Sequence, residues 1–306
     1  GQQALFKNTT ADNNTAVGFD ALSCNTTGAE NTAVGSSAGT ANTTGCRFTA
    51  VGFESGKAHT TGIENSLFGR KSGLALTTGD NNTFIGSYSG VAQTTANNNT
   101  GVGKSALAAN VSGANNTVLG FEAAKTSTDK DDNVAIGYKS LEVNAAIGNT
   151  AVGAYSADSN TTAVGITAIG NRALCSNTTG ASNTAVGICS MRSNTTAADN
   201  VAVGFCSLFT NTTGCRNTAV GLLAGLGNTT GIENSFFGRL AGCENTTGGA
   251  NTGIGGASFS SNTTGCYNTA IGHSALETST TASSNVAVGY RASGGNTTGT
   301  RNVAVG

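Results

Sequence analysis

Twelve Asn-x-Ser/Thr triplets that begin at the same place of the repeat described below are the most numerous candidates for chemistry in this 306-residue chain. Such triplets accept N-linked sugars where they lie on exposed loops. The same residue types also build tight turns, because Asn and Gly adopt the left-handed backbone conformation and Asn caps its own main chain. Both interpretations stay open: a column of covalent glycans, or a purely structural turn. The candidate acceptors are Asn8, Asn25, Asn42, Asn110, Asn160, Asn177, Asn194, Asn211, Asn228, Asn245, Asn262 and Asn296.

Eight cysteines indicate an oxidising compartment. Cys189 and Cys206 are 17 residues apart, which is the length of the repeat described below. In adjacent coils of a stacked structure their Cα spacing would fall within disulfide range, so a disulfide is possible there. The alternative is a pair of small buried thiols. The chain contains no Cys-x-x-Cys motif and only two histidines, His59 and His273, so we expect no zinc site.

Other patterns give little support for catalysis. Gly101-Val-Gly-Lys-Ser105 is similar to the end of a phosphate-binding loop, but Asn98 stands where that motif requires glycine. Asp129, Asp131 and Asp132 could bind calcium weakly, although they lack the bidentate glutamate of an EF-hand; a solvated acidic turn is the alternative. The sixteen acidic residues are scattered or interleaved with arginine, so no carboxylate pair suits glycan hydrolysis. We expect a protein that is not an enzyme and uses no cofactor or metal.

The composition narrows the class of protein. Forty-five glycines, no proline, no tryptophan and 10% charged residues do not suit an ordinary globular enzyme, and the β-branched content argues against a disordered chain. Fifteen basic residues against sixteen acidic ones leave almost no net charge, so we expect no binding to nucleic acid. No apolar run approaches the length of about 18 residues that a membrane-spanning helix needs.

A pentapeptide that ends in glycine, such as Asn217-Thr-Ala-Val-Gly221, recurs along the whole chain. Its glycine occurs eighteen times at intervals of 17 residues, except for one interval of 16 between Gly137 and Gly153. With Asn as place 1 and this glycine as place 5, the consensus is N-T-A-V-G-x-x-A-L-x-x-N-T-T-G-x-x. Such a period indicates a repeat architecture. We predict a single array over residues 1–306, a segment of a longer fibre, with a bulge or longer turn at a register slip near residues 139–159.

One unit is too short for a helix pair, and its glycine-rich, β-branched composition disfavours helix. We therefore predict an all-β fold, a parallel β-solenoid (β-roll) of about eighteen 17-residue coils stacked ~4.8 Å apart. Place 4 is apolar in all eighteen copies, as at Val17, Val34 and Val51, and place 2 is Thr in twelve. These two places share one strand face, which we predict lines the interior. Place 1 is Asn in sixteen copies, which predicts a stacked amide ladder.

Place 3 belongs to the opposite face of the strand and is never polar: it is Ala in twelve copies and Gly in two. A strand that is apolar on both faces is normally covered on both. We therefore predict that place 3 packs against copies of the same chain, as in a homotrimer. The alternative is a monomer with an exposed stripe of alanine.

Two segments, Asn133-Val-Ala-Ile-Gly-Tyr-Lys-Ser140 and Asn285-Val-Ala-Val-Gly-Tyr-Arg-Ala292, resemble repeats of YadA-type trimeric autotransporter adhesin heads. The Asn-Thr-Ala-Val-Gly arrays are also similar to segments of phage tail fibres. The resemblance covers places 1 to 8 of nearly every unit; the family's units are shorter, and the Asn-Thr-Thr-Gly turn is additional here. It implies a left-handed parallel β-roll, three chains side by side, a surface location and a role in attachment.

We expect a non-catalytic fibre shaft or adhesin segment, located outside the cell, on a cell surface or in a virion fibre. Its expected partners are copies of itself, side by side and end to end, covalent glycans, and a host surface or matrix. One alternative is an ice-binding β-solenoid, because ranks of threonine on a flat β face can order water; the predicted inward orientation of place 2 leaves only the threonine pair after Asn for this role. A third possibility is a receptor-binding segment of a phage tail fibre.

Overall fold

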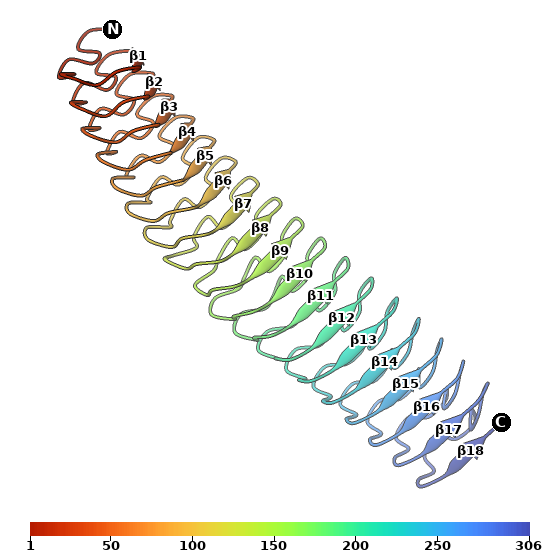
Figure 1. Ribbon diagram of the computed structural model, residues 1–306. Helices are drawn as coiled ribbons and strands as arrows, with labels where there is room; N and C mark the ends of the chain where they lie inside the picture. Colours follow the sequence, from red (N-terminus) through yellow and green to blue (C-terminus); the bar gives the residue numbers. More distant parts are fainter. The chain divides into compact units, whose positions relative to one another are not determined.

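The computed structural model describes residues 1–306 as an all-β chain: eighteen short parallel strands form a β-solenoid of coils of about 17 residues (Figure 1). The chain divides into two compact units, Gly1–Asn149 and Thr150–Gly306, here called the N-terminal and C-terminal units. The N-terminal unit contains β1 (Thr15–Val17), β2 (Thr32–Val34), β3 (Thr49–Val51), β4 (Ser66–Phe68), β5 (Thr83–Ile85), β6 (Thr100–Val102), β7 (Thr117–Leu119) and β8 (Val134–Ile136). The C-terminal unit contains β9 (Thr150–Val152), β10 (Thr167–Ile169), β11 (Thr184–Val186), β12 (Val201–Val203), β13 (Thr218–Val220), β14 (Ser235–Phe237), β15 (Thr252–Ile254), β16 (Thr269–Ile271), β17 (Val286–Val288) and β18 (Val303–Val305).

Within each unit, equal places of successive coils lie opposite one another. Val203 of β12 pairs with Val220 of β13, for example, and the neighbouring pairs keep the same register. Hydrogen bonds between coils continue outside the strands. For example, the Leu208 N–H donates to the Ala224 carbonyl of the next coil at 3.0 Å. Main-chain groups in the turns as well as in the strands are thereby paired with adjacent coils, as a stacked fold requires.

The strands face the opposite way from the prediction. Ala219 at place 3 is completely buried, whereas Val220 at place 4 is only half-buried. Val17, Val34 and Val51 do form a vertical file, but they lie on the outer surface, and Val17 is 56% exposed. The interior is narrow and holds the buried asparagine side chains of places 1 and 12. The small alanine of place 3 fits beside them. This orientation also removes the observation on which the predicted packing of place 3 against other copies depended.

The glycine at place 5 is required by the stacking. Gly221 has a φ of +140°, a conformation that L residues rarely adopt. A Cβ at this position would lie 2.5 Å from the carbonyl oxygen of Gly238 in the next coil. Any side chain here would force two coils apart, which explains why this glycine marks the repeat.

The predicted amide ladder at place 1 is confirmed. The backbone N–H of Asn217 donates to Oδ1 of Asn200 at 2.8 Å, and Asn234 Nδ2 donates to Asn217 Oδ1 at 3.1 Å. Asn217 Nδ2 also donates to the Gly231 carbonyl at 2.8 Å, which links the start of the repeat to its last turn. The ladder therefore joins successive coils and closes each coil on itself.

The missing residue at the register slip shortens a turn, and the predicted bulge or longer turn is wrong. In a regular coil Asn211 Nδ2 donates to the carbonyl of Gly214, three residues further on. In the short coil Asn144 Nδ2 donates to the carbonyl of Ala146, only two residues further on. The lost residue thus comes from the Asn-Thr-Thr-Gly turn, and the interior asparagine is retained.

Candidate interaction surfaces

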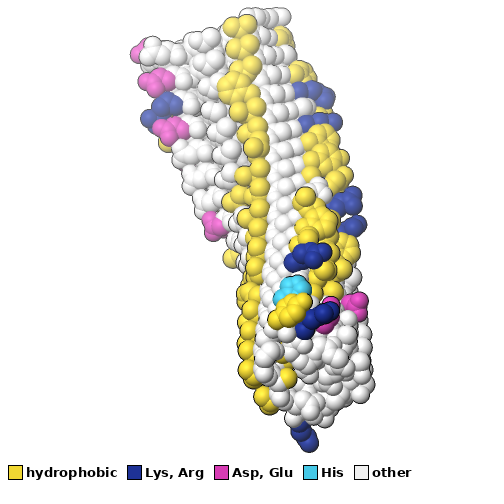
Figure 2. All heavy atoms as spheres, turned by 90° about the vertical axis from the view of Figure 1, so that its right-hand side faces the viewer, with side chains coloured by type: hydrophobic (Ala, Val, Ile, Leu, Met, Phe, Trp, Pro, Cys, Tyr) yellow, Lys and Arg dark blue, Asp and Glu magenta, His cyan; other side chains and the backbone are white.

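The first candidate surface is the outer side of the strands, formed by the side chains of places 2 and 4; we call it the strand face. Its rows are in register because each strand pairs with the same places of the next one, as in Ile254 opposite Ile271. Several place-4 side chains are well exposed, including Phe237 at 41%. Figure 2 shows a row of apolar side chains of this kind on the surface.

The strand face carries no charged residue in either unit, because places 2 and 4 contain only Thr, Ser, Val, Ile, Leu and Phe. Threonine hydroxyls and aliphatic side chains stand about 6.7 Å apart along each strand, and equal side chains stand ~4.8 Å apart between strands. The face is thus regular, uncharged and half apolar. A face with these properties is better suited to bind a second protein surface or an ordered layer of water than a dissolved ion.

A second row, at place 6, carries aromatic and cationic side chains. Phe121 stacks on Tyr138 with ring centroids 5.5 Å apart, and Lys104 lies 5.6 Å from the centre of the Phe121 ring. In the C-terminal unit His273 stacks on Tyr290 at 5.8 Å. This row at place 6 was not predicted, although the 17-residue spacing of each stacked pair is visible in the sequence.

The threonine pair that follows Asn has two different environments. The place-13 hydroxyl is used inside the fold: Thr212 Oγ1 donates to the Thr229 carbonyl of the next coil at 3.1 Å. This bond gives a structural reason for keeping the first threonine. The second threonine is exposed in all nine coils of the C-terminal unit that carry the pair, eight with Asn and one with Ser279 at place 12. These exposed residues are Thr162, Thr179, Thr196, Thr213, Thr230, Thr247, Thr264, Thr281 and Thr298.

Ten of the twelve predicted glycan acceptors are buried in the structure, which favours the structural turn, and glycosylation remains a prediction. Their side chains point into the coil, where Asn228 Nδ2, for example, donates to Asn211 Oδ1 at 2.9 Å and to the Gly231 carbonyl at 3.0 Å. A sugar on such a nitrogen would displace these bonds and has no space in the interior. Asn8 and Asn296 are partly exposed. The ten buried residues are Asn25, Asn42, Asn110, Asn160, Asn177, Asn194, Asn211, Asn228, Asn245 and Asn262.

All eight cysteines are free thiols of intermediate exposure in the structure. Cys189 and Cys206 occupy place 7 of adjacent coils. Burial and the nearby Cys189 raise the pKa of the Cys206 thiol. The geometry brings the predicted pair together, and a disulfide between them remains a prediction.

Two residues of the acidic turn, Asp129 and Asp131, accept hydrogen bonds from the backbone of the preceding coil. Asp129 Oδ1 accepts the backbone N–H groups of Ser112 at 2.8 Å and Val111 at 3.1 Å, and these bonds lower the pKa of its carboxyl group. Asp131 Oδ1 accepts the N–H of Ala114 at 2.8 Å. No group of three or more potential metal ligands is present. The predicted acidic turn is therefore part of the coil-to-coil bonding.

Ion pairs occur between neighbouring coils at place 17. Arg216 lies 3.1 Å from Glu233, and Arg47 lies 3.2 Å from Glu64; all four side chains are about half exposed. Each arginine pairs with the acid that follows it in the column. Exposed pairs of this kind contribute about 0.2–1 kcal/mol, so they support the register without determining it.

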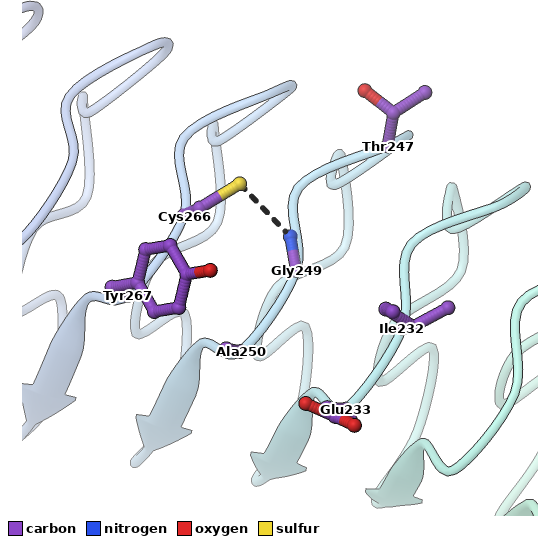
Figure 3. Close-up of a pocket in the computed structure, with 7 residues that line it drawn as sticks. All are labelled: Ile232, Glu233, Thr247, Gly249, Ala250, Cys266 and Tyr267. Atoms are coloured by element: carbon purple, nitrogen blue, oxygen red, sulfur yellow. Dashed lines mark hydrogen bonds between the residues drawn. The ribbon is translucent and has the colours of Figure 1, made fainter.

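One cleft, of about 230 Å³, interrupts the column of places 16 and 17 in the C-terminal unit (Figure 3). Its floor is formed by Gly249 and Ala250, whose coil has no large side chain at these places. Figure 3 shows Tyr267 on one side of this gap and Glu233 on the other. The lining residues are Ile232, Glu233, Thr247, Gly249, Ala250, Cys266 and Tyr267.

No helix in the structure has the length and hydropathy needed to cross a membrane. A scan against models of known protein families gives no match to this chain, and a search of curated proteins gives no significant match.

Proposed function

We propose that this chain is a non-catalytic structural segment of an extracellular fibre, which associates side by side with copies of itself through the strand face. The observation that carries this proposal is the outer row at place 4, which is apolar in every coil within each unit. Burying such side chains contributes about 0.8 kcal/mol per CH₂ group, and the contribution is repeated in every coil. The resemblance to trimeric adhesin heads favours left-handed coils and a homotrimer over other arrangements, on a cell surface or a virion.

The test replaces three outward valines of adjacent coils, Val186, Val203 and Val220, with lysine and measures the mass of the assembly by light scattering. We expect the parent chain to be a trimer and this triple variant to be a monomer, because lysine charges would be buried without partners. The matched control places lysines at Thr196, Thr213 and Thr230, which are exposed in the same coils. This control is expected to remain trimeric.

A parent chain that is monomeric at all concentrations would contradict the proposal, as would equal masses for the two triple variants. Circular dichroism of all three proteins separates loss of assembly from loss of folding. A fold that is retained while the mass falls to that of one chain is the supporting result.

A second candidate function, ice binding, gains support from the observed orientation of place 2. Thr184 and Thr218 point outward next to the place-4 valines, so the strand face presents threonine and valine in parallel ranks. Ranks of hydroxyl and methyl groups at a fixed spacing can hold an ordered layer of water. A thermal-hysteresis assay tests this function: activity in a monomeric parent chain that is lost when Thr184 and Thr218 become lysine would favour ice binding over the fibre, and no activity would remove it.

A further inference from the structure

The cleft at Gly249 and Ala250 is a gap of one coil between the larger side chains of Ile232 and Glu233 in the preceding coil and of Cys266 and Tyr267 in the following one. Glu233 and Tyr267 flank this gap and are separated by two coil spacings, or about 9.6 Å. The intervening Ala250 reaches only to its Cβ, so a ring-sized space remains above it. Tyr267 is 71% exposed, and one face of its ring is therefore available to a ligand in this space.

The polar groups around the cleft belong to side chains, because the floor has already used its backbone donors. The Gly249 N–H donates to Cys266 Sγ at 3.3 Å, as Figure 3 shows, and the Ala250 N–H donates to the Ile232 carbonyl at 2.9 Å. A ligand would meet the hydroxyl of Thr247 at the rim and the carboxylate of Glu233 on the far wall. These are groups that bind hydroxyls.

Glu233 is held in place from the opposite side. Its Oε1 pairs with Arg216 at 3.1 Å, so the carboxylate is oriented and its second oxygen can accept a hydrogen bond. A carboxylate is only an acceptor when ionised. The cleft therefore favours a ligand that donates hydrogen bonds and disfavours one that carries its own negative charge.

We propose that this cleft binds one neutral sugar ring, with the C–H face of the ring stacked on Tyr267 and its hydroxyls bonded to Glu233 and Thr247. A pyranose combines an apolar face with a polar edge, and the cleft offers the same two kinds of surface. A flat aromatic ligand fits less well, because it would take water from Glu233 without supplying a donor. This inference is independent of the fibre proposal, since it needs only one folded chain.

The experiment is saturation-transfer NMR on the full chain with three neutral probes, methyl β-D-glucopyranoside, methyl α-D-mannopyranoside and methyl β-D-galactopyranoside, and with glucuronic acid as the anionic comparison. We expect transfer to at least one neutral probe, strongest at the C–H protons of one ring face, and at least about tenfold weaker binding of glucuronic acid. Absence of transfer to all three neutral probes, or equal binding of glucuronic acid, would overturn the proposal.

Two variants and one control locate the site. Tyr267→Ala removes the stacking surface, and Gly249→Ile fills the gap with the side chain that the preceding coil carries at the same place, Ile232. Each is expected to weaken binding by at least about tenfold. The control Tyr290→Ala removes an equally exposed tyrosine, 69% accessible and stacked on His273, outside the cleft. Transfer that is unchanged in both cleft variants, or lost equally in the control, would show that the sugar does not bind there.

Discussion

The ring of Phe236 occupies the space that Gly242 leaves empty in the same coil. A Cβ on Gly242 would lie 2.5 Å from Cδ1 of this ring. Gly90 and Phe84 have the same relationship in the N-terminal unit, at 2.6 Å. Place 3 and place 9 thus share one interior volume: a phenylalanine at one of them requires glycine at the other, whereas an alanine at place 3 can accompany leucine at place 9, as Ala202 accompanies Leu208.

Exchanging the large and the small side chain between positions 236 and 242 should show that their effects on the free energy of unfolding are coupled. Phe236→Ala is expected to cost about 3–5 kcal/mol because it leaves a cavity, and Gly242→Leu should also destabilise because the space is filled. The double variant recreates the combination of Ala202 and Leu208 and should recover most of the loss. Urea denaturation of the four proteins measures the coupling. Additive losses in the double variant would contradict the shared volume.

The buried asparagines of place 12 form a second ladder, because the side chain of each donates to that of the preceding coil, and this ladder should be sensitive to single substitutions. Asn211 Nδ2 bonds Asn194 Oδ1 at 3.1 Å and the Gly214 carbonyl at 2.9 Å, and both Asn211 and Asn194 are buried. Asn211→Ala leaves these acceptors in the interior with fewer donors, so we expect a loss of about 2–4 kcal/mol in the free energy of unfolding. The control Thr213→Ala, two residues away and exposed, should change it by less than about 0.5 kcal/mol. Equal effects of the two substitutions would contradict a structural role for the ladder.

His59 replaces an asparagine in this ladder and should make folding depend on pH. Its Nδ1 lies 2.9 Å from Asn42 Oδ1, and Asn65 Nδ2 lies 3.1 Å from its Nε2. The neutral ring satisfies both contacts by donating from Nδ1 and accepting at Nε2. Burial lowers the pKa of His59 to about 4, partly opposed by the negative charge of Asp80.

Because the pKa is lower in the folded chain than in the unfolded one, the unfolded state binds the proton first as the pH falls. The stabilisation that neutral His59 gives to the folded chain is fully present above about pH 6.5. It is lost as the pH falls from 6.5 to 4, which lowers the free energy of unfolding by about 3 kcal/mol in total. His59→Asn restores the consensus side chain and should remove this part of the pH dependence. Unfolding curves of both proteins at pH 7.5, 5.5 and 4 give the comparison. Parallel losses in the two proteins would assign the effect to other groups.

The repeat length, the all-β coil and the place-1 ladder could be predicted from the sequence, since a fixed period and an Asn in sixteen of eighteen copies leave few alternatives. Which face of the strand points into the coil could not be predicted from hydrophobicity, because places 3 and 4 are both apolar in every copy. A signal for it was present in the pairing of Phe84 with Gly90 and of Phe236 with Gly242, since only residues that share an interior compensate in size. The cleft depends on Gly249 and Ala250 in a single coil, so the consensus conceals it.

A disulfide between Cys189 and Cys206 is the last prediction. Both thiols occupy place 7 of adjacent coils, and the expected Cα spacing of ~4.8 Å lies within the range that a disulfide spans. Because the pKa of Cys206 is raised, little thiolate forms at neutral pH, and cross-linking by oxidised glutathione should be slow at pH 7 and faster at pH 9. The bond would close a short loop and raise the free energy of unfolding by about 3 kcal/mol. Peptide mapping of the oxidised chain should find this pair linked, with Cys206→Ser as the control that leaves Cys189 free. If Cys189 forms only bonds between chains, or if both thiols stay reduced at pH 9, the two side chains do not meet as the coil register requires.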